Sequence, residues 1–321
     1  MKIMYVSNNE KYRYDTPTIC DWNQLPSLFT QKGHHVLGVG KHELKSFYKK
    51  YKEFNPDIII VDWIPASVVP LLYKKLGLIK CPIVHTWGDY YKEMMTNYPS
   101  WLTGFLEQYT VKKSDFIITV SKYNQKRAQK LGKRVYYIPH GVSDVQKSTN
   151  INLNDKLLVK SNLKVVYLGE QSKWKKTDEI IKAVEGLDCE LFLIGETNPE
   201  FIKLKYWNTH FLEKVPPEEV RAVLQQADIL INPSNQDCNY KFFEYIRAGK
   251  PILAYDDLPR YLFTHRKNAF LTKDFKAGLR ELILSPSLRY YMEQEVKKIE
   301  TFSWDNISEK YLELIKVHIT L

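Results

Sequence analysis

The sequence has few of the features that mark secreted or membrane-spanning proteins. Its four cysteines, Cys20, Cys81, Cys189 and Cys238, lie far apart and form no CxxC pair, which argues against both a structural zinc site and a disulfide framework. No apolar run approaches the roughly 20 residues that a membrane span requires. The opening residues, MKIMYVSNNE, follow a strand pattern and not that of a secretion signal. These absences predict a cytoplasmic protein with reduced, mostly buried cysteines.

Positive charge is abundant but unevenly distributed. Residues 1–150 hold 22 Lys and Arg against 12 Asp and Glu, an excess of ten, whereas residues 151–321 hold 25 of each. The whole net charge of +10 therefore belongs to the first half. Such asymmetry indicates an anionic partner for that half, whether a phospholipid surface, a lipid-linked phosphate or nucleic acid. A merely soluble, Lys-rich surface would give the same composition.

Apolar strands alternate with helix-length segments along the whole chain. At 321 residues, with 44% apolar residues, the chain suits two domains of about 150 residues each. Between them, residues 141–162 are rich in Ser, Asn, Asp and Lys and predict a linker. Uninterrupted apolar strands separated by helices predict an α/β fold with two doubly wound, mostly parallel sheets. The expected strands begin near Ile3, His35, Asp57, Pro82, Asp115 and Val135, and then near Leu163, Glu190, His210, Asp228, Pro251 and Ala269, before three closing helices at 273–284, 287–298 and 303–316.

The segment 229–254, ILINPSNQDCNYKFFEYIRAGKPILA, carries the clearest sign of a binding site. It is read as a short strand, a polar loop, a helix that stops at Gly249 and a second strand. A loop that ends on a helix N-terminus beyond the carboxyl end of a strand binds anions in open α/β sheets. We therefore expect the backbone N–H groups of Asn239, Tyr240 and Lys241 to face phosphate. Glu244, further along the helix, is expected to accept hydrogen bonds from sugar hydroxyls.

Five motifs, in their order along the chain, resemble those of the retaining family 4 glycosyltransferases of the GT-B fold. The closest likeness is NYKFFEYIRAGKPILA, which is similar to the donor-site helix of that family. The others are listed in chain order: FIITVSKYN from Phe116, IPHGVS from Ile138, YLGEQSKWKK from Tyr167 and the closing FSW from Phe302. The resemblance covers nearly the whole chain and implies two facing Rossmann-like domains. Residues 1–142 would bind the acceptor, residues 143–302 the nucleotide sugar, and a helix at 303–321 would cross back to the first domain.

On the donor side, the resemblance implies a set of binding residues. Glu244 would bind the ribose, and Lys175, in the loop after Gly169, would bind the diphosphate, with Lys173 and Lys176 as substitutes. No metal and no further cofactor are implied, because a helix N-terminus and basic side chains would stabilise the leaving group. A solvated Lys175 and a Glu244 placed only by the helix dipole are the alternatives.

Two donor positions depart from the family pattern. Gln236, beside Asp237, stands where the family has a Glu that touches the sugar, so Asp237 or a backbone N–H would take that role. Glu170 stands where the family commonly has an Arg on the phosphate. Because its charge would repel diphosphate, Glu170 is expected to point elsewhere or to pair with Lys173 or Lys175.

On the acceptor side, His85 is expected to end a strand and to face the cleft between the domains. There it would bind a sugar hydroxyl or shuttle a proton, with Asp89 as its partner, and it joins Asp237 and Lys175 as a catalytic candidate. A structural His bonded to backbone is the alternative. The glycine-free loop 7–18 would recognise the acceptor, with Asn9 and Arg13 as binding candidates.

The predicted activity is the transfer of a hexose from a UDP- or GDP-sugar to a glycan or lipid-linked hydroxyl, with retention of configuration. A catalytically degenerate sugar-nucleotide or polyanion binder is the alternative, and nucleic acid is not expected as a partner because no recognition motif is present. The Lys-rich aromatic stretches KSFYKKYKEF from Lys45 and YYKEMMTNYPSWLTGF from Tyr90 are compatible with peripheral association at an anionic membrane. Packing of one helix face into the core would give the same spacing.

Overall fold

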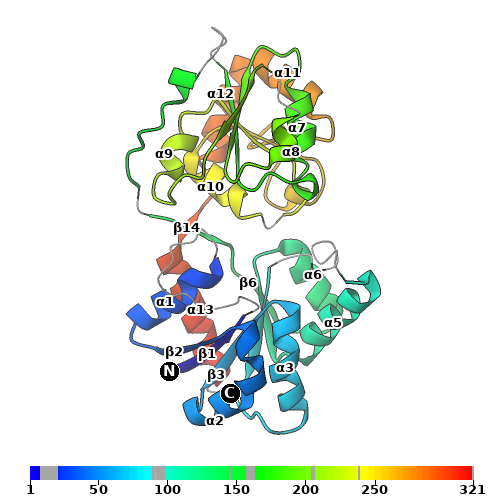
Figure 1. The fold of residues 1–321 in the computed structure, drawn as a ribbon, viewed down its shortest axis with the longest axis vertical. Helices are drawn as coiled ribbons and strands as arrows, with labels where there is room; N and C mark the ends of the chain where they lie inside the picture. The colour runs from blue at the N-terminus through cyan, green and yellow to red at the C-terminus, as the bar shows by residue number, and fades with distance from the viewer. Residues whose placement is uncertain are drawn as a thin grey trace. The chain divides into compact units, whose positions relative to one another are not determined.

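The computed structural model of the chain describes residues 1–7, 21–88, 91, 98–144, 146–156, 163–203, 207–237 and 239–319. The chain divides into two compact units (Figure 1). Unit 1 comprises Met1–Gly141 and Phe302–Leu321, and unit 2 comprises Val142–Thr301. The boundaries expected from sequence, after residues 142 and 302, each differ from these by one residue.

Unit 1 is built on a six-stranded parallel sheet in the order β2-β1-β3-β4-β5-β6. All six strands coincide with the predicted apolar segments. Strands β3 and β4 are buried at every position, as expected for a sheet with helices on both faces. The strands are β1 (Lys2–Val6), β2 (His35–Val39), β3 (Ile58–Asp62), β4 (Ile83–Trp87), β5 (Phe116–Thr119) and β6 (Val135–Tyr137).

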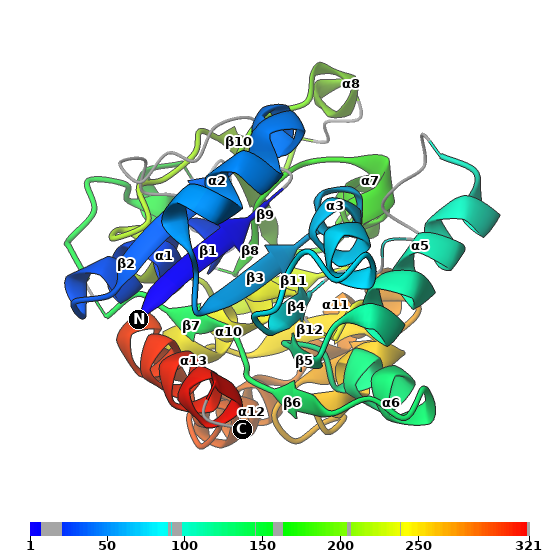
Figure 2. The same ribbon diagram turned by 90° about the horizontal axis from the view of Figure 1, so that it is seen from below.

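Helices cover both faces of this sheet. Figure 2 shows α2 (Phe47–Phe54), α3 (Ile64–Lys75), α5 (Ser100–Lys113) and α6 (Lys122–Lys130) on one face. On the other face, α13 (Trp304–Ile319) packs against α1 (Asp21–Gln31), where Lys32 bridges Asp305 at 2.7 Å and Glu309 at 3.1 Å. The last helix of the chain is therefore part of the first unit. The short helix η1 (Lys41–Ser46) precedes α2, and β7 (Gly141–Val142) pairs with β14 (Phe302–Ser303).

Unit 2 repeats the architecture with the order β10-β9-β8-β11-β12-β13, again all parallel. Its strands are β8 (Lys164–Leu168), β9 (Glu190–Ile194), β10 (Thr209–Leu212), β11 (Ile229–Asn232), β12 (Ile252–Tyr255) and β13 (Phe270–Thr272). They also match the predicted segments. Both domains thus confirm the α/β, doubly wound class.

The helices of unit 2 lie in two layers. On one face α7 (Thr177–Ala183) packs against α11 (Phe275–Leu284), which contacts α12 (Pro286–Val296), and on the other α9 (Val220–Leu224) packs against α10 (Tyr240–Ala248). The remaining short helices are α8 (Pro199–Ile202), η2 (Leu153–Lys156), η3 (Lys173–Lys175) and η4 (Leu258–Tyr261). In the described part of the chain, no helix combines the length and the apolar character needed to cross a bilayer. Of the four cysteines, Cys189 is buried and Cys81 partly buried, both free, and Cys20 and Cys238 lie outside the described residues.

Candidate active site

The segment 229–254 lies where the winding of the second sheet changes direction. From β8 the chain moves outward to β9 and β10, and it then returns to β11 on the opposite side of β8. Adjacent strands that wind in opposite directions leave a crevice beyond their carboxyl ends, where open α/β sheets bind ligands. The ladder between β8 and β11 is short, and Tyr245 bridges the two strands beyond it: its hydroxyl donates to Ile231 O (3.1 Å) and accepts from Leu168 N (3.0 Å).

The loop between β11 and α10 is buried and ends in a helix cap. Gln236 and Asp237, the pair predicted to face the sugar, are only 5% and 2% exposed. Asn239 is the N-cap of α10, and its Oδ1 accepts from the N–H of Lys241 at 3.2 Å. Of the three amides predicted to face phosphate, that of Lys241 therefore already has an acceptor. The helix stops at Gly249 in the left-handed conformation (φ +70°), as predicted.

Glu244 is a buried carboxylate held by its own helix. Its side chain is 5% exposed, and Oε1 accepts a hydrogen bond from the hydroxyl of Tyr240, one turn earlier. Burial raises the pKa of Glu244, while the hydrogen bond from Tyr240 and the charges of Arg247 and Arg221 oppose the rise. Sequence reasoning considered only the backbone of Tyr240. The spacing of four residues on one helix face was the signal that could have revealed this pair.

The loop after β8 approaches the first turn of α10 closely. Gly169 has φ +120°, and a Cβ atom there would lie 2.4 Å from Cε and 2.7 Å from Nζ of Lys241. The Lys241 ammonium donates to the hydroxyl oxygen of Tyr167 at 2.6 Å, and that hydroxyl donates to Glu170 O at 2.7 Å. The backbone conformation therefore favours glycine at position 169, and a larger residue there would displace the end of the Lys241 side chain. The position of the Lys241 side chain was missed from sequence because only its N–H was considered.

Lys175 and Glu170 lie on the same loop as Gly169. The Glu170 carboxylate accepts from Trp174 Nε1 at 3.3 Å, and Lys175 Nζ lies 3.5 Å from the centroid of the Trp174 ring. The indole is the partner that sequence reasoning did not anticipate for Glu170. Lys175 is half-buried, and its charge lowers the pKa of Lys241. The structure thus brings Gly169, Lys175 and the α10 residues together in one unit.

His85 lies inside β4 and not at its end, so this prediction was wrong. The strand continues through Thr86 and Trp87, because helices on both faces keep all five of its positions buried. The imidazole is fully buried. Its Nδ1 lies 3.2 Å from Val61 O, and Nε2 has no hydrogen-bond partner among the described residues. With Nδ1 donating to the carbonyl, Nε2 carries the lone pair. Burial lowers the pKa of His85 to about 4, so the ring is neutral at pH 7 and Nε2 can accept a proton or a hydrogen bond.

The other acceptor predictions lie outside the described residues. These are Asn9, Arg13 and Asp89. Of the two aromatic basic stretches, the one over α2 is explained by packing: Phe47 and Tyr51 are buried, and Tyr48 stacks on Tyr73 with ring centroids 5.0 Å apart. In the second stretch, by contrast, Trp101 is 73% and Phe105 62% exposed.

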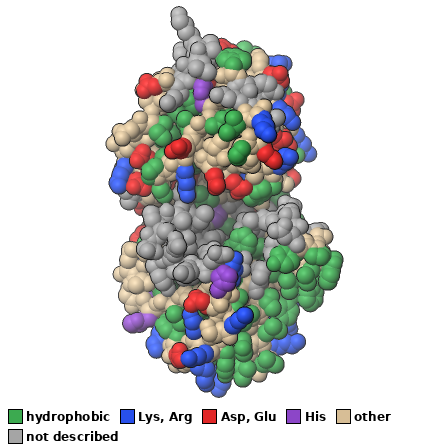
Figure 3. Space-filling model, viewed as in Figure 1, with side chains coloured by type: hydrophobic (Ala, Val, Ile, Leu, Met, Phe, Trp, Pro, Cys, Tyr) green, Lys and Arg blue, Asp and Glu red, His purple; other side chains and the backbone are tan. Residues whose placement is uncertain are grey.

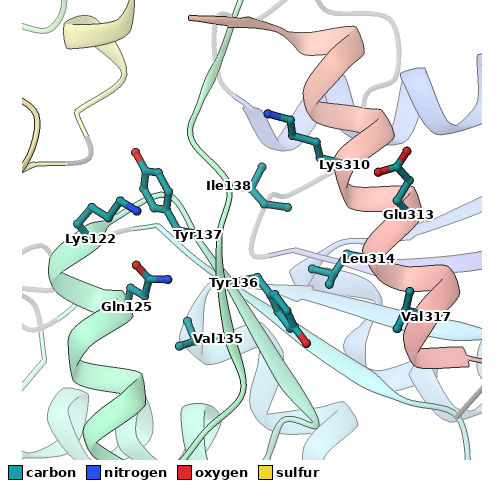
Figure 4. A pocket seen from close by; sticks show the side chains of 10 residues that line it. All are labelled: Lys122, Gln125, Val135, Tyr136, Tyr137, Ile138, Lys310, Glu313, Leu314 and Val317. Carbon is teal, nitrogen blue, oxygen red and sulfur yellow. The ribbon is translucent and has the colours of Figure 1, made fainter. Parts of the chain in front are cut away.

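Unit 1 also has a groove of about 560 Å³ beside its edge strand β6. Figure 4 shows Tyr137 directed toward Lys122 of α6 and Tyr136 toward α13. Lys122 Nζ lies 3.6 Å from the Tyr137 ring centroid, and Tyr136 forms a 3.3 Å hydrogen bond with His318 Nε2. No predicted site residue lines this groove. Within the described residues, no cluster of His, Cys, Asp or Glu is placed to hold a metal ion.

Comparison with known proteins identifies relatives for both halves of the chain. Residues 22–146 match the family model described as Glycosyltransferase Family 4, and residues 162–285 match that described as Glycosyl transferases group 1. An uncharacterised glycosyltransferase of Methanocaldococcus jannaschii is 24% identical in an alignment that covers 96% of this chain and 85% of that protein.

Two solved structures are similar along their full length. Anabaena HepE, in complex with UDP-glucose, matches with a TM-score of 0.76 and 15% identity, covering 99% of this chain and 100% of that one. The sucrose-phosphate synthase of Thermosynechococcus elongatus matches with a TM-score of 0.79 and 11% identity, covering 98% of each chain. At these identities the similarity shows a shared fold.

Proposed function

We propose that the chain is a glycosyltransferase of the GT-B fold that transfers a hexose from a UDP- or GDP-sugar, with retention of configuration, to a hydroxyl of a glycan or a lipid-linked acceptor. UDP is the favoured nucleotide because HepE, of the same fold, binds UDP-glucose. The donor would bind unit 2 beyond β8 and β11, and the acceptor would bind unit 1.

One observation carries the donor assignment. Glu244 is a carboxylate buried in the second turn of α10, yet among the described residues its only hydrogen bond comes from the hydroxyl of Tyr240. A buried carboxylate normally accepts several hydrogen bonds. The two hydroxyls of a ribose would supply them, and they would replace the water lost on burial. Tyr240 would then hold the carboxylate in position for the ribose.

The proposed chemistry follows from the groups around the leaving diphosphate. As the bond from sugar to phosphate breaks, negative charge grows on the phosphate oxygens, and Lys175 together with the N-terminus of α10 would stabilise it. The acceptor hydroxyl would attack from the same face and pass its proton to the leaving phosphate. Asp237 and Gln236 would bind the sugar. These cationic and dipolar groups act without a metal, and we expect none to be required.

The acceptor side is supported by charge gathered on one segment of unit 1. Residues 98–134, from α5 to the start of β6, hold eight Lys and Arg against only two acids. Both acids are neutralised: Glu107 pairs with Arg127, and Asp115 with Lys74 at 2.5 Å. This segment therefore contributes six of the ten excess positive charges, and no acidic group within it is left to offset the exposed lysines.

Exposed aromatic side chains lie on the same segment. Trp101 and Phe105 lie on consecutive turns of α5, preceded by Tyr98, which is 53% exposed. Leu72 of the neighbouring α3 and Leu76, which caps that helix, are also exposed, and Figure 3 shows hydrophobic side chains gathered over α3 and α5. Trp and Phe beside Lys are typical of surfaces that lie at an anionic bilayer. We propose that this surface holds the enzyme at such a membrane, where it would meet a lipid-linked acceptor.

The donor assignment is tested with Glu244→Gln, which keeps the size of the side chain and removes its charge. We expect UDP-sugar binding to weaken at least about tenfold, because a charged hydrogen-bond partner is lost. A thermal-shift screen of nucleotide sugars on the wild type would identify both base and sugar. Unchanged donor binding and transfer in Glu244→Gln would overturn the assignment. Donor binding without transfer or hydrolysis would favour the catalytically degenerate alternative.

A further inference from the structure

We propose that the side chain of Lys241, which α10 carries, binds the donor diphosphate together with Lys175 and replaces the basic residue that the loop after β8 lacks at Glu170. The inference rests on the proposed donor site in unit 2. It assigns to Lys241 a role beyond that of its backbone N–H.

The geometry places the Lys241 ammonium beside the loop that follows β8. Its Nζ lies 2.6 Å from the Tyr167 hydroxyl oxygen and 4.1 Å from the centroid of that ring. A Cβ atom at Gly169 would be 2.7 Å from it. The loop position that follows Gly169 is Glu170, where the family resemblance implies an Arg. The Lys241 ammonium, carried by α10, therefore lies beside the same loop backbone from which the Arg of the family would have extended.

The ammonium lacks a counter-charge. It has three N–H donors, and the described residues give it one hydrogen-bond acceptor, the Tyr167 oxygen, and no ion pair. Burial and the charge of Lys175 both lower its pKa well below the usual value, and Glu170 opposes this shift. Two lysines that lower each other's tendency to be charged, with one exposed acid near them, favour a ligand that carries two or more negative charges. A diphosphate has that charge and the oxygens to accept the remaining donors.

A second group at the same helix end also lacks an acceptor. Asn239 is 7% exposed, and while its Oδ1 caps α10, its Nδ2 has no hydrogen-bond partner among the described residues. A buried amide NH₂ without an acceptor costs free energy. Phosphate oxygens beside Lys241 would relieve this cost as well, so the two observations point to the same anion.

The experiment measures UDP and uridine binding by calorimetry for the wild type, Lys241→Met and Lys182→Met. Methionine keeps the length of the side chain without its charge. Lys182, 61% exposed on α7 of the same unit, is the matched control for the loss of one charge. We expect Lys241→Met to weaken UDP binding about ten- to hundredfold, as for a charged hydrogen bond, and to leave uridine binding unchanged. Lys182→Met should bind UDP like the wild type.

Two further readouts separate this role from a structural one. Adding Glu170→Arg to Lys241→Met should restore UDP binding, because the charge returns to the loop. Binding of UDP by the wild type should also take up protons in the pH range where unliganded Lys241 titrates, because a bound diphosphate favours the charged side chain. This uptake is seen as a dependence of the binding heat on buffer ionisation enthalpy, and Lys241→Met should lose it. Equal UDP affinities for the Lys241 and Lys182 variants would overturn this inference. A wild type that binds no nucleotide would overturn the proposed function itself.

Discussion

Gly141 and Trp304 are in such close contact that a Cβ atom at residue 141 would lie 2.6 Å from Cδ2 of the Trp304 ring and 2.8 Å from its Cα. Trp304 opens α13 and is 5% exposed. The indole therefore anchors the last helix of the chain against the backbone where the first unit ends. Because one of the two contacts is to backbone, a side-chain rotation alone cannot make room for a larger residue.

We predict that Gly141→Ala lowers the free energy of unfolding of unit 1 by about 1–3 kcal/mol, the usual cost of overpacking. Thermal unfolding followed by tryptophan fluorescence would measure it. The control is Gly104→Ala on α5, where an added Cβ has no neighbour within 4 Å. That change should be neutral or stabilise by up to about 1 kcal/mol, because alanine favours a helix interior over glycine. Equal effects of the two substitutions would contradict the steric role of Gly141.

The Tyr240–Glu244 pair predicts a pH dependence of donor binding. Burial raises the pKa of Glu244, and the Tyr240 hydroxyl lowers it. In the proposed site the ionised carboxylate of Glu244 binds ribose, so UDP affinity should fall as pH drops through the pKa of Glu244. In Tyr240→Phe this fall should begin at higher pH than in the wild type. Measurements of UDP affinity from acidic to neutral pH would show the shift, with Glu244→Gln as the variant that lacks the titration.

His85 predicts a loss of stability in mild acid. Its pKa is about 4 in the folded protein, because burial disfavours the charged ring, against an ordinary value of 6.5 for histidine. As pH falls, the unfolded chain therefore takes up a proton on His85 before the folded protein does. The contribution of neutral His85 to the free energy of unfolding is complete above pH 6.5 and declines as pH falls toward 4. At pH 5 the loss would be about 2 kcal/mol.

The measurement compares the wild type with His85→Asn in urea unfolding at pH 7 and pH 5. Asparagine can keep the donor to the Val61 carbonyl but does not titrate. The difference between the two proteins should shrink by the amount lost from His85, while all other acid-sensitive groups cancel. An unchanged difference would show that the ring titrates normally.

The fold could be predicted from sequence because its signals are local. Uninterrupted apolar strands such as DIIIVD and ELFLIG, each followed by a helix, allow few arrangements other than a parallel sheet with helices on both faces. The stop at Gly249 was equally local, since it depends on the conformational freedom of one residue. The extent of β4 was harder, because the polar His85 and Thr86 interrupt an apolar pattern although both are buried.

The site could be predicted only in part, because its most informative contacts join distant residues. Lys241 reaches Tyr167 across 74 positions of sequence, and no spacing rule reveals this. The partner of Glu170 was missed because the acid was expected to pair with a lysine. Its carboxylate instead accepts a hydrogen bond from the indole N–H of Trp174, four residues later. The aromatic stretches looked alike in sequence. Only the packing of the sheet separates the buried rings of α2 from the exposed rings of α5.

The exposed surface of α5 predicts binding to anionic vesicles. We expect Trp101→Ala/Phe105→Ala to reduce sedimentation with vesicles of phosphatidylcholine and phosphatidylglycerol about tenfold or more, because both rings would lose their burial at the interface. Lys112→Gln/Lys113→Gln should weaken binding by about 1 kcal/mol per residue and make it less sensitive to salt.

The matched control is Leu284→Ala/Tyr290→Ala, which removes two side chains that are 74% and 68% exposed in unit 2. That variant should bind like the wild type, since its region carries no excess of positive charge. Binding that is equal in all variants, or independent of the anionic lipid, would show that this surface serves another partner.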